Sequence, residues 1–334
     1  MTRSQLLVIE GFLVVSGLLL LLALFGGQLF GGGGDDDGAP GGVVIATARP
    51  QGQQGGGLLP TNSSGDDESQ TGYVQGCAPP TDRDFLSSNQ ILSFYGNPYT
   101  EQLGILGALE PDALVAQLRD LAAQYDAVNK LRGVQPAFHM ITTTAQPHPG
   151  SEGLYVLHVD EDTIQEWVDL ACQEGLLLFL DLQIGRNTLD AEIGRIEKFL
   201  RLPNVHLALD PEFAMHGDEV PGEVIGGLDA DEINHAQALL EEIVEANNLP
   251  DKVLIVHQFQ DNMIQRPEAI ENYERVRMIV DTDGFGEPAA KVSKFKTFAQ
   301  PAEYSGIKLF FKQDQPLMTP EEVAKLRPDL IIYQ

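Results

Sequence analysis

The segment DEDTIQEWVDLACQEGLLLFLDLQ (residues 160–183) contains the unit that the chain repeats from residue 91 to its end. Residues 160–175 have the apolar spacing of a helix, with acidic residues at the positive end of the helix dipole and Gly175 as a C-cap. Residues 176–183 are apolar except for Asp181 and Gln183, which is typical of a buried strand with a polar end. We therefore expect a helix followed directly by a strand.

Eight apolar runs of this kind follow one another along the chain. They cover residues 91–97, 136–142, 176–183, 205–212, 252–259, 276–283, 307–314 and 330–334. Amphipathic helices are expected between them, for example at residues 111–128, 229–248 and 319–326. Strands that alternate with helices pair in parallel, and eight of them in roughly 250 residues indicate a closed barrel. The sequence thus predicts an α/β fold, a (β/α)8 TIM-type barrel over residues 84–334 that lacks the final helix.

Composition limits the classes of partner. The chain has 334 residues, with 21 Lys and Arg against 49 Asp and Glu, and its formal net charge is -28. Nucleic-acid binding is not expected, because neutralising phosphates requires clustered cations. No cofactor is expected either, because the glycine runs do not lie between a strand and a helix, where phosphate-binding loops occur.

The N-terminal region predicts a membrane anchor. Residues 5–30 are almost entirely apolar and, at about 1.5 Å per residue, can cross a hydrocarbon core of about 30 Å. Arg3 precedes this run and aspartates at 35–37 follow it, which favours a cytoplasmic N-terminus. The alternative is a cleaved signal peptide, but its apolar region spans only about 7–15 residues. We expect a cytoplasmic stub (residues 1–4), a single-pass signal anchor in the cell membrane (5–30), a flexible Gly/Asp-rich linker (31–83) and an extracytoplasmic barrel.

The two cysteines are Cys77 and Cys172. Cys172 shares a predicted helical face with Ile164, Trp167 and Ala171, so the favoured interpretation is a small buried apolar residue. A disulfide with Cys77 is the less favoured alternative, which requires an oxidising compartment.

Side-chain alternation indicates which residues face the inside of the barrel. In VHLALDPE (residues 205–212), Leu207 and Leu209 share one face, while Asp210 and Glu212 share the other. If the leucines meet the surrounding helices, both acids project into the barrel mouth, the C-terminal end where such barrels place their sites. Asp181 ends the neighbouring strand, so three carboxyl groups come together, and their like charges raise at least one pKa.

The motif LALDPEF (residues 207–213) carries a family resemblance. Its D-x-E at the end of a barrel strand resembles (β/α)8 glycoside hydrolases, including chitinase-like and bacterial muramidase-like groups. This resemblance implies that Glu212 is a general acid/base and that Asp210 orients or stabilises, and we expect Asp181 to act as base or stabiliser. The longer DxxDxDxE pattern of chitinase-like enzymes does not occur. The stretches FLDLQIG, LALDPEFAM, VLIVHQF and DGFG also resemble a group of uncharacterised exported bacterial proteins, which implies no particular activity.

We therefore expect a glycoside-hydrolase-like domain that acts on a cell-surface or extracellular glycan, or on another small polar ligand, in the barrel mouth. Polar residues near the strand ends are expected to bind the substrate, namely Tyr95, Asn97, His139, Gln183, His257, Gln258, Asp281, Asp283, Lys312, Asp314 and Tyr333. Two alternatives remain open. One is a metal-dependent hydrolase with ligands among His139, Asp181, Asp210, Glu212, His257 and Asp283. The other is a non-catalytic surface module that binds a glycan or a peptide.

Overall fold

The computed structural model describes residue 77, residues 81–299 and residues 302–334. The expected anchor (residues 5–30) and nearly all of the expected linker (31–83) lie outside the described residues. Among the residues that are described, no helix combines the length and the apolar character that a membrane span requires.

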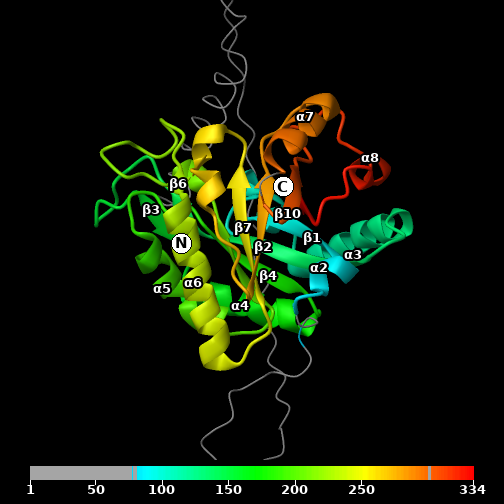
Figure 1. The fold of residues 1–334 in the computed structure, drawn as a ribbon, viewed down its shortest axis with the longest axis horizontal. Coiled ribbons are helices and arrows are strands. Elements are labelled where there is room, and N and C mark those ends of the chain that lie inside the picture. Colours follow the sequence, from blue (N-terminus) through cyan, green and yellow to red (C-terminus); the bar gives the residue numbers. More distant parts are fainter. Residues whose placement is uncertain (1–76, 78–80, 300–301) are drawn as a thin grey trace, which may run out of the picture.

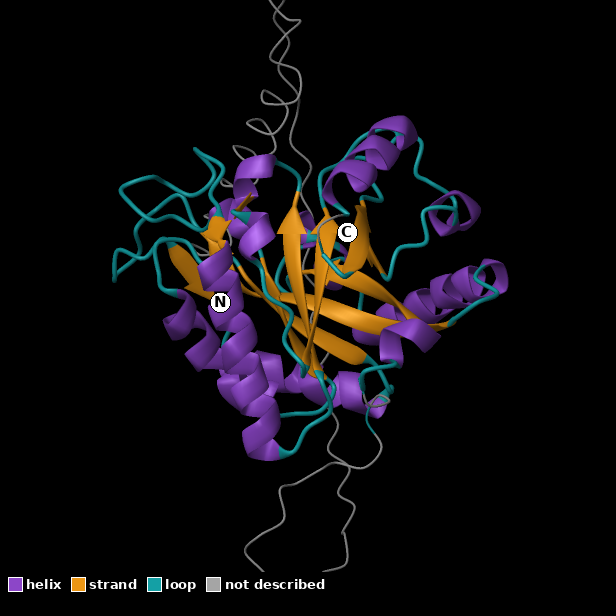
Figure 2. Ribbon diagram, in the orientation of Figure 1, coloured by secondary structure: helices purple, strands orange, loops and turns teal. Residues whose placement is uncertain are grey.

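Eight parallel strands form a closed barrel, as the sequence predicted (Figures 1 and 2). They are β1 (Asn89–Gly96), β2 (Gly133–Ala145), β4 (Leu177–Leu182), β5 (Val205–Leu209), β7 (Lys252–Gln258), β9 (Val276–Thr282), β10 (Tyr304–Leu309) and β11 (Leu330–Tyr333). Each pairs with its neighbours in chain order, and β1 closes the barrel by pairing with both β2 and β11. All eight strands therefore point their carboxyl ends toward one mouth.

Helices separate most of these strands. They are α3 (Pro111–Val128), α4 (Glu161–Gln173), α5 (Leu189–Leu200), α6 (Ala230–Asn247), α7 (Pro288–Phe298) and α8 (Pro320–Ala324). Side chains of Asp160, Thr188 and Asp229 cap the starts of α4, α5 and α6 by accepting backbone N–H groups. The connection from β7 to β9 contains only short 3-10 turns and β8 (Ile264–Gln265), which pairs with β6 (Leu228–Asp229). Strand β3 (Val156–His158) lies antiparallel to β2.

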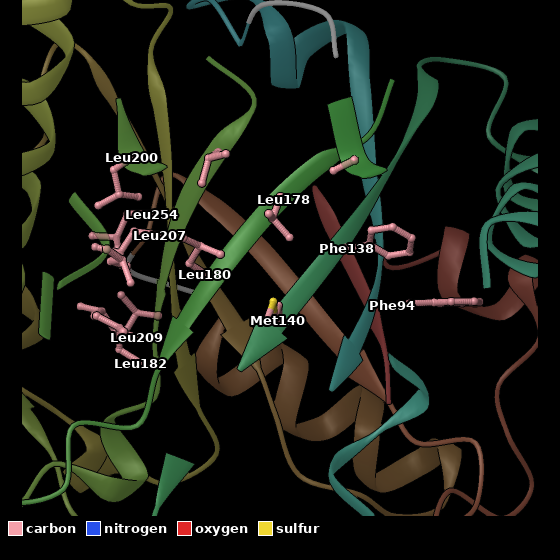
Figure 3. Packing of buried hydrophobic residues seen from close by; sticks show 14 of the residues in the cluster. Phe94, Phe138, Met140, Leu178, Leu180, Leu182, Leu200, Leu207, Leu209 and Leu254 are labelled. Carbon is pink, nitrogen blue, oxygen red and sulfur yellow. The ribbon is translucent and has the colours of Figure 1, made fainter. Parts of the chain in front are cut away.

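The core has two layers, one on each side of the strands. Leu207 and Leu209 belong to the outer layer, where the strands meet the helices, and Figure 3 shows labelled members of this layer. Phe179, Ala208 and Ile255 belong to the inner layer, which fills the barrel. The predicted alternation in β5 is therefore confirmed, and Asp210 continues the inward-facing set.

The N-terminal end of the barrel is closed by the short helix α2 (Phe85–Ser88). Phe85 and Leu86 are buried in the same cluster as the barrel residues Ile91 and Leu330. Thr81 is also buried and donates a hydrogen bond to a backbone carbonyl. With this end filled, the C-terminal mouth is where the barrel can receive a ligand.

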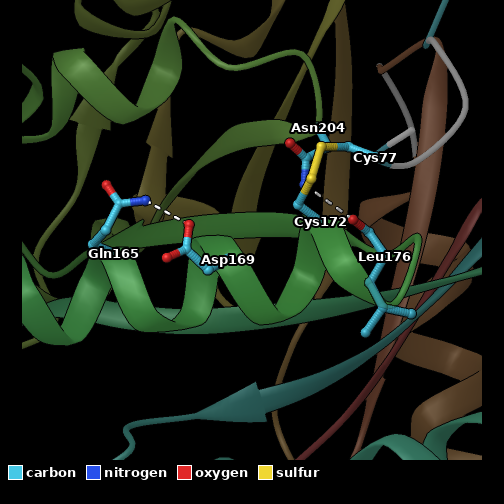
Figure 4. The surroundings of a disulfide bond; sticks show 6 residues. All are labelled: Cys77, Gln165, Asp169, Cys172, Leu176 and Asn204. Carbon is cyan, nitrogen blue, oxygen red and sulfur yellow. Dashed lines mark hydrogen bonds between the residues drawn. A yellow bond between two sulfur atoms is a disulfide. The ribbon is translucent and has the colours of Figure 1, made fainter. Parts of the chain in front are cut away.

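A disulfide joins Cys77 to Cys172 (Figure 4). The expectation that Cys172 is a free, buried apolar residue was wrong. Its helix buries Ala171 and Trp167 toward the core, whereas Cys172 lies at the edge of that face, half-buried. There its Cα is 4.2 Å from that of Cys77, within reach of a bridge.

Candidate active site at the barrel mouth

A cavity of about 230 Å³ lies at the C-terminal ends of the strands. Of the expected site residues it is lined by Tyr95, Gln183, Asp210, Glu212 and Asp283. Aromatic and basic residues complete the wall, among them Phe213, Phe259, Phe285, Phe310 and Lys308. The cavity thus combines carboxyl groups with apolar rings, which is the usual composition of a small-molecule site.

Asp210 and Glu212 enter the cavity from a turn directly after β5. The strand ends at Leu209, three residues earlier than expected, because Pro211 begins a 3-10 turn that extends to Phe213. The backbone of Glu212 is fixed from outside, since its carbonyl oxygen accepts a hydrogen bond from Gly226 N at 2.7 Å. A Cβ at Gly226 would lie 2.3 Å from a backbone oxygen, so only glycine fits this approach.

The surroundings of these two acids favour their protonated forms. Burial raises the pKa of Asp210 to about 7 against the opposing charge of His257, and the charge of Asp181 adds to the rise. Burial also raises the pKa of Glu212 well above its ordinary value, with further contributions from the charges of Asp210 and Asp283. Either group can therefore hold a proton that an ordinary surface carboxyl would have lost.

Asp283 has the opposite character. Its Oδ2 lies 2.9 Å from Lys308 Nζ, and its Oδ1 accepts a hydrogen bond from Gly284 N at 2.6 Å. Burial alone would raise the pKa of Asp283, but the charges of Lys308 and His257 outweigh it and hold the pKa below its usual value. The Lys308 ammonium also lies 3.7 Å from the centre of the Tyr95 ring, an attractive cation–π geometry. The mouth thus holds an ionised carboxylate, Asp283, beside Glu212, a carboxyl group that favours its protonated form.

A chain of buried polar groups lies beneath this cavity. Asp181 Oδ2 accepts hydrogen bonds at 3.1 Å from His139 Nε2 and from His257 Nε2, and His257 Nδ1 donates to Asp281 Oδ2 at 2.9 Å. All four side chains are fully enclosed. None of the four lines the mouth cavity. A substrate in the mouth cavity therefore does not contact Asp181, which we expected to act as base or stabiliser. It also does not contact His139 or His257, which we expected to bind it.

The charges along this chain follow from its contacts. Burial would lower the pKa of His257, but hydrogen bonds to Asp181 and Asp281 raise it to about 10. Burial lowers the pKa of His139 to about 4 despite its bond to Asp181. Burial would raise the pKa of Asp181, but the hydrogen bonds from both histidines outweigh it and lower that pKa. At neutral pH His257 therefore carries the proton between two carboxylates, and His139 is neutral.

The same groups could also hold a metal ion. Ligand atoms of His139, Asp181 and His257 lie within 4.8 Å of one another, and so do those of His257, Asp281 and Asp283. Imidazole with carboxylate is a donor set that suits zinc or manganese. An ion at either place would replace the proton that His257 shares with its carboxylates. The metal alternative therefore has a possible location, beneath Asp210 and Glu212 rather than between them.

Three residues that we expected to bind the substrate lie outside the mouth cavity. Two point away from the barrel interior, and the third is held by a hydrogen bond to a neighbouring strand. Tyr333 points outward from β11, and its hydroxyl lies 2.8 Å from that of Tyr125 on α3. Gln258 alternates with the inward-facing His257, so its side chain points away from the barrel interior. Asn97 Nδ2 donates to the carbonyl oxygen of Ile141 at 3.1 Å, which braces two strand ends. None of these three residues lines the mouth cavity.

The expected strand at residues 307–314 is also displaced. It occupies Tyr304–Leu309, so Lys312 lies in the following loop, where it is exposed. Asp314 turns back and accepts hydrogen bonds from Phe310 N and Gly286 N, and it thereby ends the strand instead of facing a ligand. The lysine of the site is Lys308. Its inward position was recoverable from the alternation with Ile307 and Leu309, both of which pack in the outer layer.

No protein-family model matches this chain, and no curated protein matches it. The resemblance to glycoside hydrolases therefore rests on the barrel fold and on the D-x-E motif at Asp210 and Glu212.

Proposed function

We propose that the barrel hydrolyses a glycosidic bond in a cell-surface or extracellular glycan, with Glu212 as general acid/base. One observation carries this proposal: the mouth cavity contains a carboxyl group with a raised pKa, Glu212, and another with a lowered pKa, Asp283. Glycoside hydrolysis needs a protonated acid and an ionised carboxylate on the two sides of the scissile bond.

Each residue of the mouth cavity has a separate role in the proposed reaction. Glu212 donates its proton to the leaving oxygen, and Asp283, held ionised by Lys308, acts as nucleophile or as base toward water. The charge of Asp210 helps to keep Glu212 protonated. Asp181, assigned to direct chemistry from sequence alone, acts instead through electrostatics, because it is enclosed below the cavity. Phe213, Phe259 and Phe285 offer apolar ring surfaces to a sugar.

The proposed location is outside the cell. The apolar run at residues 5–30 and the charges around it support a membrane anchor, and the Cys77–Cys172 disulfide is in keeping with an oxidising compartment. The barrel is then tethered by residues 31–76 to the outer face of the membrane.

A metal-dependent hydrolase is a second candidate, favoured by the ligand atoms of His139, Asp181 and His257. These three side chains would hold the ion, and the ion would polarise a bound ligand or water. The enclosed position of all three makes this candidate the weaker one, because a substrate in the mouth cavity does not touch them.

The test is a screen of the full-length chain against cell-wall and extracellular glycans, with release of reducing ends as the readout. Glu212→Gln should lower the rate by about 10²–10⁴-fold, whereas Glu223→Gln, at an exposed nearby position, should leave it unchanged. The rate should fall as pH rises above the raised pKa of Glu212 and as pH drops below the lowered pKa of Asp283. Full activity of Glu212→Gln would refute its assignment. Loss of activity on chelation with recovery on adding zinc would favour the metal-dependent candidate.

A further inference from the structure

We infer that the mouth cavity continues into a second binding site, which takes a further sugar unit of a neutral oligosaccharide. This inference rests on the proposed function and specifies the substrate class. A second cavity of about 400 Å³ adjoins the first, and the two share three lining residues, Gln102, Gln313 and Gln334. A ligand bound in the mouth cavity can therefore extend past these three glutamines into the second cavity.

Cavity size supports the extension. At about 230 Å³ the mouth cavity is smaller than the roughly 300–1,000 Å³ typical of sites that enclose a small-molecule ligand. The second cavity, at about 400 Å³, falls within that range. The acids Asp210, Glu212 and Asp283 line only the first cavity, so the second offers room for binding away from the reacting bond.

The lining of the second cavity suits an uncharged ligand with both apolar and hydrogen-bonding surfaces. Ile105, Leu109 and Phe311 supply the apolar wall. Amide side chains surround it, those of Gln102, Gln117, Gln313 and Gln334. Its charged side chains are one acid, Glu101, and one base, Lys312, which offset each other. Sugar rings present apolar faces together with hydroxyl and amide groups, and they match this lining.

The wall between the two cavities is held in place at Gln334. Gln334 N donates to Leu309 O at 2.9 Å, and Phe311 N donates to Gln334 O at 2.9 Å. The Phe311 ring is tilted against the Tyr333 ring at 5.0 Å between centres. This fixed backbone lowers the entropic cost of binding on the Gln334 side of the wall. Because these backbone groups already pair with each other, they offer no free edge to which a peptide strand could add, which favours a sugar over an extended peptide.

The experiment measures how affinity depends on chain length. The full-length chain carrying Glu212→Gln, which should bind without cleaving, is titrated calorimetrically with neutral oligosaccharides of increasing length. We expect affinity to rise by about tenfold or more once the chain reaches the second cavity. Leu109→Asp should abolish this gain without lowering affinity for the shortest binding sugar. Leu109 is 38% exposed, so the substitution should not disturb folding, which thermal unfolding will verify.

Leu131→Asp is the matched control, because Leu131 is 79% exposed and lies just before β2, at the opposite end of the barrel. It should leave the length dependence intact. Two outcomes would overturn the second site and leave the proposed function intact, provided that the unsubstituted chain hydrolyses a glycan. In one, affinity does not depend on the length of the oligosaccharide. In the other, the gain in affinity with length persists in Leu109→Asp. Length-dependent binding without hydrolysis would support the site and refute the catalysis. Binding of no oligosaccharide, or of neutral peptides only, would overturn both.

Discussion

The Asp283–Lys308 ion pair gives the sharpest test of the mouth's electrostatics. Lys308 is 3% exposed, and its ammonium lies 2.9 Å from Asp283 Oδ2. In Lys308→Met the carboxylate loses its nearest cation and keeps the hydrogen bond from Gly284 N, together with the weaker influence of His257, Lys291 and Lys294.

The expected cost is large. Breaking a buried ion pair by removing one partner typically costs about 3–5 kcal/mol, because the other charge stays buried without compensation. For a domain of this size, that loss corresponds to a fall in melting temperature of roughly 6–20 °C. Burial then dominates the pKa of Asp283 and raises it, so the acid limb of any activity profile should move to higher pH.

The dependence of stability on pH has a definite sign. In the unsubstituted chain the pKa of Asp283 is depressed, so its contribution to stability is present above the ordinary aspartate pKa and is lost as pH falls through the folded-state pKa. In Lys308→Met this acid-side loss should disappear, because protonation then relieves the buried charge.

Thermal unfolding of the full-length chain, purified in a mild detergent and followed by circular dichroism, measures the effect. Lys325→Met, at an exposed lysine beyond α8, is the control and should melt like the unsubstituted chain. The double variant Lys308→Met/Asp283→Asn should recover part of the loss, since it removes both charges. Melting of Lys308→Met at the control temperature, or strict additivity in the double variant, would show that the pair does not stabilise the barrel.

Two further predictions concern stability. Cys77→Ala/Cys172→Ala, which opens a loop of 95 residues, should lose about 2–5 kcal/mol in a urea titration, and reductant should destabilise only the unsubstituted chain; an unchanged midpoint would contradict this. Burial would raise the pKa of Glu192, but hydrogen bonds from His158 and Thr143 lower it, so the stability that Glu192 supplies should be lost as pH falls below about 4.3. Glu192→Gln should be less stable at neutral pH and lose this acid dependence; identical pH curves for both proteins would rule out the ionised role.

Local pattern was sufficient to predict the barrel and the direction of its inner residues. A strand's side chains alternate by geometry alone, so Leu207 and Leu209 on one face placed Asp210 on the other without knowledge of any neighbour. The same rule applied to β10 identifies Lys308, but the apolar run IKLFF predicts a strand that continues beyond Leu309, where β10 ends. Asp314 ends the strand because its side chain accepts the hydrogen bond from Phe310 N. This contact forms only once the loop has folded back.

Sequence by itself thus determined the order of strands and helices, the face that each strand turns inward, and the end at which polar residues gather. Those properties depend on spacing along the chain. Tertiary structure decided which groups from distant parts of the chain come into contact. Asp283 pairs with Lys308, His257 lies between Asp181 and Asp281, and Cys77 is bonded to Cys172. It therefore also decided the charge of each carboxyl group, because burial and neighbouring charge set a pKa and neither can be read from one strand alone.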